Sequence, residues 1–187
     1  IGSIADISAF SFHPVKNITT GEGGAVTTNN QKLAKRIKLF RNHGITTDHR
    51  QRAEQGSWFY EMDDLGYNFR ITDFQCALGI SQLKKLPEWI IKRQEIAKAY
   101  DDAFDKEPNL NPLVKSPDNN HAYHLYVVKI LFEKLSIDRS QLFLLLKELG
   151  IGINVHYIPV HLHPYYRKKF ETKIGMFPNA ELAYEQI

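Results

Sequence analysis

The order of apolar and polar positions along the chain predicts alternating strands and helices. Residues 4–12 are mostly apolar with three polar interruptions, which predicts a buried β-strand. Helical spacing follows at Leu33, Ile37 and Phe40. Asn29 or Asn30 can cap this helix, and Gly44 lies beyond its end. We expect its apolar face to pack on the sheet.

The middle of the chain predicts a long loop and then two helices. Residues 45–65 show no sustained period, so we expect an extended surface loop anchored by Trp58, Phe59 and Tyr60. Thr72 and Gln75 have the spacing of a capping box that opens a helix. We expect Pro87 to interrupt that helix and a second one to run from there to Phe104.

The last third predicts a small α/β unit. Residues 105–120 are rich in proline and asparagine, which places a domain boundary there, between 1–107 and 108–187. Beyond it we expect a strand over 123–132, a helix from Asp138 to Gly150 and a second strand over 152–157. Strand, helix and strand together favour a compact α/β domain.

Composition narrows the class of protein. With 43% hydrophobic and 24% charged residues, the chain is typical of a globular protein, and its formal net charge of +3 does not predict a nucleic-acid partner. The absence of a long apolar stretch or leader favours a cytoplasmic protein without a membrane partner. Cys76, the single cysteine, fits a small buried hydrophobe. Because the first residue is not methionine, we expect a fragment of a longer chain.

Lys16 is the residue whose sequence context points most clearly to a chemical role. It follows the first strand and a turn at Pro14, and Gly21, Gly23 and Gly24 come after it. A lysine amine becomes a nucleophile toward a carbonyl when desolvation or nearby charge lowers its pKa, and a loop leaving a buried strand can provide both. Most lysines near such turns are simply solvated, so the pattern alone does not decide the role.

Three blocks of sequence resemble one enzyme family. They are residues 11–24 (SFHPVKNITTGEGG), 66–75 (GYNFRITDFQ) and 154–161 (NVHYIPVH). In this order they resemble the DegT/DnrJ/EryC1/StrS family of sugar aminotransferases, which use pyridoxal 5'-phosphate (PLP). The resemblance is strongest to the subfamily of nucleotide-sugar transaminases on the route to pseudaminic acid. It implies an α/β fold, the PLP-dependent transferase fold type I. The chain would hold the second part of the large PLP-binding domain and most of a truncated small C-terminal domain. The family's upstream phosphate loop and pyridine-pairing aspartate have no counterpart here.

The resemblance also implies roles for individual residues. Lys16 would form the Schiff base with PLP and then act as the acid and base, whereas a related branch of dehydratases has histidine at that position. Ser11 matches a serine aimed at the cofactor phosphate. Asn68 matches a position that reaches the neighbouring subunit's phosphate in a homodimer, and Arg70 could neutralise a carboxylate or phosphate. Capping of a helix entry is the alternative for Asn68 and Arg70.

The substrate contacts are less constrained by the sequence. The resemblance implies that groups such as His13, His124, Tyr157 and His161 grip the sugar and the amino donor. Histidine clustering around position 161 also suggests a metal, but the spacing is not that of a ligand set, so we expect none.

The resemblance implies transfer of an amino group, from a donor such as L-glutamate, to a UDP-linked 4-keto-6-deoxy-HexNAc. Two alternatives stay open. One is an aminotransferase or dehydratase for another nucleotide sugar, and the other is a non-enzymatic PLP-binding sensor or assembly protein.

Overall fold

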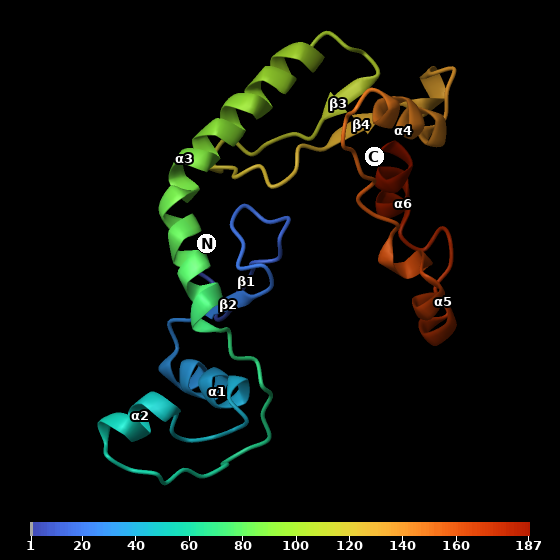
Figure 1. The fold of residues 1–187 in the computed structure, drawn as a ribbon. Helices are drawn as coiled ribbons and strands as arrows, with labels where there is room; N and C mark the ends of the chain where they lie inside the picture. The colour runs from blue at the N-terminus through green and yellow to red at the C-terminus, as the bar shows by residue number, and fades with distance from the viewer. Residues whose placement is uncertain (1) are drawn as a thin grey trace. The chain divides into compact units, whose positions relative to one another are not determined.

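The structure is a computed structural model that describes residues 2–187, and it divides into two compact units (Figure 1). Unit 1 ends at Ile90 and unit 2 begins at Ile91, so the division falls within the long helix α3 (Asp73–Phe104). The boundary expected between residues 107 and 108 stays a prediction.

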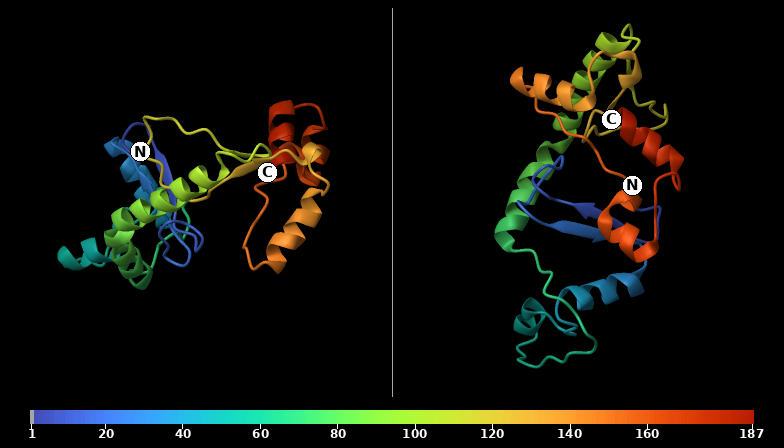
Figure 2. Two further views of the ribbon diagram at one scale, coloured as in Figure 1. Left: turned by 90° about the horizontal axis from the view of Figure 1, so that it is seen from above. Right: turned by 90° about the vertical axis from the view of Figure 1, so that its right-hand side faces the viewer.

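Unit 1 begins with a β-hairpin made of β1 (Ser8–Ser11) and β2 (Gly24–Thr27). The strands are antiparallel, with Ser8 opposite Thr27 and Ser11 opposite Gly24, and Figure 2 shows them side by side. The strand expected over 4–12 is therefore present in its second half. The expected burial is wrong, since Phe10 is 36% exposed, because no further strand of the described chain extends this sheet.

Helix α1 (Gln31–Arg41) has the caps that the sequence predicts. Asn30 Oδ1 accepts the backbone N–H groups of Lys32 (2.9 Å) and Leu33 (3.3 Å). Beyond the helix, Gly44 has a positive φ of 70° and donates its N–H to Leu39 O. The predicted helix is thus confirmed from cap to end.

The segment expected to be a loop contains α2 (His49–Glu54). A capping box starts it: Gln51 N donates to Asp48 Oδ1 (3.0 Å), and Asp48 N donates to Gln51 Oε1 (2.9 Å). The Gln51 N–H holds the pKa of the Asp48 carboxyl below its usual value. The anchoring role expected for Trp58 is wrong, since its side chain is 85% exposed.

Helix α3 is one continuous helix of 32 residues (Figure 1). Its capping box is confirmed, with Thr72 N donating to Gln75 Oε1 (3.1 Å) and Gln75 N donating to Thr72 Oγ1 (3.3 Å). The interruption expected at Pro87 is wrong. A proline removes one hydrogen bond and costs about 3 kcal/mol, and here the helical turns on both sides outweigh that cost.

Unit 2 contains the rest of α3, one short hairpin and five further helical segments. The hairpin is β3 (Leu110–Pro112) antiparallel to β4 (Val128–Ile130). The helical segments are η1 (Phe132–Lys134), α4 (Arg139–Glu148), η2 (Val160–Leu162), α5 (Pro164–Phe170) and α6 (Pro178–Gln186).

Two of the three elements expected in unit 2 are present. The first strand is confirmed only as β4, and α4 is confirmed with Asp138 as its cap, accepting Gln141 N–H at 2.8 Å. The strand expected over 152–157 is wrong, because this segment forms no ladder with β3 or β4. Alternating apolar residues suit a strand, but a strand also needs a partner with free backbone groups.

Candidate functional site

Lys16 lies in the loop of residues 12–23 that joins β1 to β2. The loop is closed at its base, where Phe12 N donates to Gly23 O (2.9 Å) and Thr20 N donates to Phe12 O (3.1 Å). Within it, Lys16 N donates to His13 O (2.9 Å), which forms a tight turn at the lysine. The Lys16 side chain is half-buried. The loop therefore holds its lysine in a defined turn rather than on a free chain.

The first half of α3 fixes the lysine loop from outside. Gln82 Oε1 accepts the Thr19 N–H at 2.8 Å, and Gln75 Nε2 donates to Glu22 O at 2.8 Å. These two glutamines lie two turns apart on the helix, so they hold the two arms of the loop. A rigid helix thus supports the segment that carries the candidate nucleophile.

The glycines allow this close packing. A Cβ on Gly23 would lie 2.3 Å from Thr20 Oγ1 and 3.1 Å from Ile71 Cδ1. Thr20 is 4% exposed, and its hydroxyl donates to Glu22 O at 2.7 Å. The structure thus shows that Gly23 lets the loop pack on itself.

Ser11 and His13 lie at the start of the same loop. Ser11 is the last residue of β1 and is exposed, and its Oγ accepts a long contact from His13 N (3.4 Å). His13 Nε2 is 3.7 Å from Glu22 Oε1, with both side chains open to solvent. PLP needs a primary amine that reacts with its aldehyde and hydrogen-bond donors for its phosphate. Lys16 has the amine and Ser11 has a hydroxyl, so the residues present fit PLP.

Asn68 and Arg70 lie on the segment that precedes α3. Asn68 forms an isolated antiparallel bridge with Asn42, and Arg70 Nη1 donates to Asn42 Oδ1 at 2.8 Å. Both Asn68 and Arg70 are exposed. Because Thr72 supplies the cap of α3, the capping alternative for these two residues has no support.

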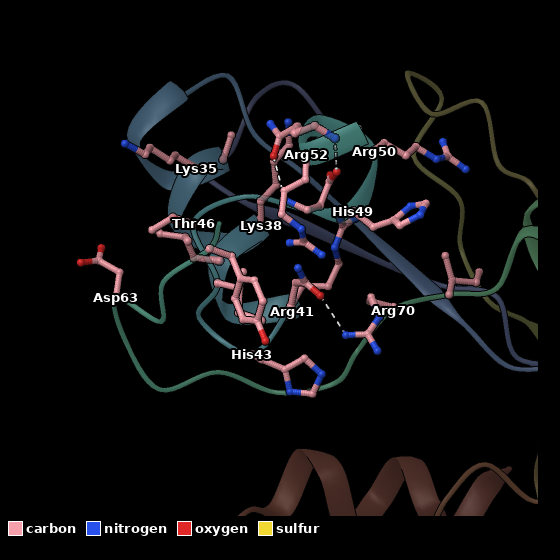
Figure 3. A pocket seen from close by; sticks show the side chains of 18 of the residues that line it. Lys35, Lys38, Arg41, His43, Thr46, His49, Arg50, Arg52, Asp63 and Arg70 are labelled. Carbon is pink, nitrogen blue, oxygen red and sulfur yellow. Dashed lines mark hydrogen bonds between the residues drawn. The ribbon is translucent and has the colours of Figure 1, made fainter. Parts of the chain in front are cut away.

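A cavity of about 1170 Å³ adjoins Arg70 and was not anticipated from the sequence. Its lining comes from α1, α2, the segment 42–48 between these helices, and residues 60–76 (Figure 3). Arg70 lies on one side of it, with a dashed line marking its bond to Asn42, and the labelled Arg41 is the last residue of α1. The sequence held one signal, the basic residues at helical spacing in α1.

In unit 2, His161 is 8% exposed and belongs to a packed cluster. Its Nε2 lies 2.8 Å from Glu181 Oε1, and its ring packs against Phe177 with centroids 4.7 Å apart. The backbone N–H of Gly175 and then the His161 imidazole hold the pKa of the Glu181 carboxyl below its usual value. This pair joins η2 to α6, and a substrate contact by His161 stays a prediction.

The other two candidates in unit 2 differ in exposure. His124 is half-buried, whereas Tyr157 is 68% exposed and lies edge-on to the His156 ring, with centroids 4.2 Å apart. His156 Nδ1 is buried without a hydrogen-bond partner. The structure brings Tyr157 next to His156, and the sugar-binding role of His124 and Tyr157 stays a prediction.

A second polar cluster lies in unit 2, and no sequence motif predicts it. The Asp101 carboxylate accepts Lys115 Nζ at 2.5 Å and the Tyr126 hydroxyl at 2.7 Å. The Lys115 ammonium and then the Tyr126 hydroxyl hold the pKa of Asp101 below its usual value, while the hydrogen bond that Lys115 donates to Asp101 raises the pKa of Lys115. These residues are far apart in sequence, so no local spacing pattern predicts the cluster.

Over residues 2–187, no group of three or more His, Cys, Asp or Glu side chains is placed to hold a metal ion. In the same range, no helix combines the length and apolar character needed to cross a membrane.

Comparison with known proteins identifies the family. The family model described as "DegT/DnrJ/EryC1/StrS aminotransferase family" matches residues 1–187, so the chain belongs to this family. The spore coat polysaccharide biosynthesis protein SpsC of Bacillus subtilis is 44% identical, covering all of this chain and 48% of SpsC. The UDP-4-amino-4,6-dideoxy-N-acetyl-beta-L-altrosamine transaminase of Campylobacter jejuni is 44% identical, covering 90% of this chain and 43% of that protein.

Solved structures agree with this assignment. PseC of Helicobacter pylori, an aminotransferase involved in the biosynthesis of pseudoaminic acid, has a TM-score of 0.87 at 35% identity and covers all of this chain and 47% of PseC. The putative sugar aminotransferase Spr1654 of Streptococcus pneumoniae, in its PLP form, has a TM-score of 0.85 at 32% identity, covering 99% and 46%. A PMP form of Spr1654 is also similar.

These likenesses confirm the predicted fold class and the predicted family of sugar aminotransferases. The chain spans about half the length of the curated relatives it matches.

Proposed function

We propose that the complete protein is a PLP-dependent aminotransferase that acts on a nucleotide sugar. The amino donor is L-glutamate, and the acceptor is the keto carbon of a UDP-linked 4-keto-6-deoxy-HexNAc. The observation that carries this proposal is Lys16, a half-buried lysine on a loop fixed by Gln75 and Gln82 of α3, in a chain that belongs to a sugar aminotransferase family.

Different residues of the chain bind the cofactor and move the proton. Bound PLP supplies the electron sink that makes amino transfer feasible. Lys16 Nζ holds the cofactor covalently and, once displaced by the amino donor, moves the proton at the reacting carbon. Ser11 Oγ donates to the cofactor phosphate, and Asn68 serves the phosphate of a neighbouring subunit in a homodimer. The enzyme works in the cytoplasm.

Similarity to named relatives supports the choice of sugar. The Campylobacter jejuni relative is named as a UDP-sugar transaminase, and PseC is described as acting in pseudoaminic acid biosynthesis. SpsC, equally identical, favours a second candidate, transfer to another nucleotide sugar in polysaccharide synthesis. Lysine rather than histidine at position 16 favours transamination over dehydration in either case.

The test is a coupled assay with the complete gene product. Purified protein with PLP receives glutamate labelled with nitrogen-15 and the UDP-linked keto sugar, and mass spectrometry follows the label into the sugar. The proposal expects 2-oxoglutarate and a labelled amino sugar, and neither from Lys16→Ala.

Two other outcomes lead to different conclusions. Release of 2-oxoglutarate without a labelled product from this sugar would keep the aminotransferase and replace the substrate. Binding of PLP without any release of 2-oxoglutarate would favour the alternative of a non-enzymatic PLP-binding sensor or assembly protein.

A further inference from the structure

Gln75 of α3 contacts two parts of unit 1 with the two ends of its side-chain amide. Its Oε1 accepts the backbone N–H of Thr72 at 3.1 Å and the Thr72 hydroxyl at 3.0 Å. Its Nε2 donates to Glu22 O, in the lysine loop, at 2.8 Å. The side chain is half-buried. Gln75 therefore joins the start of α3 to the loop that carries Lys16.

The residue type is suited to this double contact. An amide offers both an acceptor and a donor, and its orientation is fixed here because Thr72 N can only donate and Glu22 O can only accept. A glutamate would also complete the capping box, but an ionised carboxylate has no hydrogen to donate to Glu22 O. The contact with the lysine loop therefore distinguishes glutamine from glutamate at position 75.

On the loop side, Gln75 holds the peptide bond that closes the lysine loop. Glu22 O accepts the Thr20 hydroxyl (2.7 Å) as well as the Gln75 amide, so both of its lone pairs are used. The next carbonyl, Gly23 O, accepts the Phe12 N–H at 2.9 Å and closes the base of the loop. A shift of Glu22 would therefore be transmitted to the base of the loop.

On the helix side, Gln75 fixes the chain where the segment of Asn68 enters α3. The Thr72 N–H that it accepts comes shortly after Asn68 in the sequence. Between them, Ile71 lies against the loop, since a Cβ on Gly23 would be 3.1 Å from Ile71 Cδ1. The segment and the lysine loop are thus held together at two points, one polar and one apolar.

We propose that Gln75 is a positioning residue that keeps the Lys16 loop and the segment of Asn68 in fixed relative positions. It acts through Glu22 O and the Thr72 N–H. The inference rests on the proposed function, which assigns cofactor contacts to Lys16 and Asn68. Because Asn68 serves the phosphate of the neighbouring subunit, one Gln75 supports contacts to two bound cofactors.

Two variants of the complete protein separate positioning from helix capping. Gln75→Glu keeps the acceptor for Thr72 and removes the donor to Glu22 O. Thr72→Val does the reverse, because it removes the hydroxyl of the cap and keeps the Gln75 amide. A role limited to capping α3 would make Thr72→Val the more harmful change, whereas positioning of the loop makes Gln75→Glu the more harmful one.

Two measurements report on the loop. The first is release of PLP on dilution, followed by visible absorbance, and the second is hydrogen exchange over residues 12–24 in the PLP-free protein. We expect Gln75→Glu to release PLP about three- to tenfold faster than wild type, as the loss of one hydrogen bond implies, and to exchange faster. Thr72→Val should stay within about twofold of wild type in both, while its midpoint temperature of unfolding falls.

The proposal is overturned if Gln75→Glu keeps the wild-type rates of PLP release and exchange, or if Thr72→Val speeds both as much as Gln75→Glu does. Should the added charge unfold Gln75→Glu, Gln75→Met removes the donor without adding a charge, and equal release from Gln75→Met and Thr72→Val would contradict the proposal. Failure of the proposed function is separate, because the wild-type protein would then bind no PLP or release no 2-oxoglutarate, while exchange in the PLP-free protein would still report on Gln75.

Discussion

Gly79 of α3 lies so close to Thr20 of the lysine loop that a Cβ on Gly79 would be 2.9 Å from Thr20 Cγ2. Real carbon pairs do not come that close. Thr20 has little freedom to move, since it is buried and its hydroxyl is bonded to Glu22 O. The contact therefore sets the distance between the helix and the loop that carries Lys16.

This contact predicts an unusual result for Gly79→Ala. In an ordinary helix the change stabilises by about 1 kcal/mol, whereas here we expect a net destabilisation of about 1–2 kcal/mol from overpacking. The measurement is urea unfolding of the complete protein. The double variant Gly79→Ala with Thr20→Ser removes Cγ2 and keeps the hydroxyl, so it should recover the loss. A Gly79→Ala protein more stable than wild type would show that the contact is loose.

Gln82 is predicted to be a positioning residue for Lys16. In Gln82→Leu the Thr19 N–H loses its acceptor, which costs about 1 kcal/mol and lets the loop drift. We expect PLP to dissociate several times faster, measured as loss of visible absorbance during dilution. Gln94→Leu is the control, because Gln94 bonds Asn120 and His121 in unit 2. Equal release from both variants would remove the positioning role.

The Asp101 cluster predicts a dependence of stability on pH. Because Lys115 holds the pKa of Asp101 below its ordinary value of 3.8, the cluster stabilises the fold above that pH and loses this effect as pH falls through the native pKa. Lys115 and Tyr126 have raised pKa values, so their contributions hold below about pH 10 and fall at higher pH.

Asp101→Asn should lower the free energy of unfolding by about 1 kcal/mol near pH 7, since Lys115 is partly exposed and its attraction is screened. The difference from wild type should shrink below pH 4, which urea unfolding at several pH values would show. Asp102→Asn, whose partner Lys98 is solvent-exposed, is the control with little expected effect. A difference that stays constant down to pH 3 would contradict the assignment.

Local signals in the sequence account for much of the fold. Asn30, Thr72 with Gln75, and Asp138 each cap the helix that the sequence predicts, because a cap depends on residues only two or three positions apart. The same kind of box at Asp48 and Gln51 starts α2, although the segment that contains it shows no sustained hydrophobic period.

Long-range packing could not be predicted in this way. The burial of residues 4–12 and the strand over 152–157 depend on which elements lie beside them, which no local pattern states. The support of Thr19 by Gln82 spans 63 positions, and the cavity assembles several segments. The candidate lysine was recognisable from the sequence, whereas the helix that fixes its loop was not.

We propose that Lys16 holds the cofactor covalently, and borohydride reduction of the complete, PLP-loaded protein followed by peptide mapping tests this role. The account predicts a pyridoxyl label on Lys16, and no label in Lys16→Arg, which keeps the charge but not the nucleophile. Lys32→Arg, which changes a lysine of α1 outside the loop, should be labelled as wild type is. A label on another lysine, or undiminished labelling in Lys16→Arg, would contradict the account.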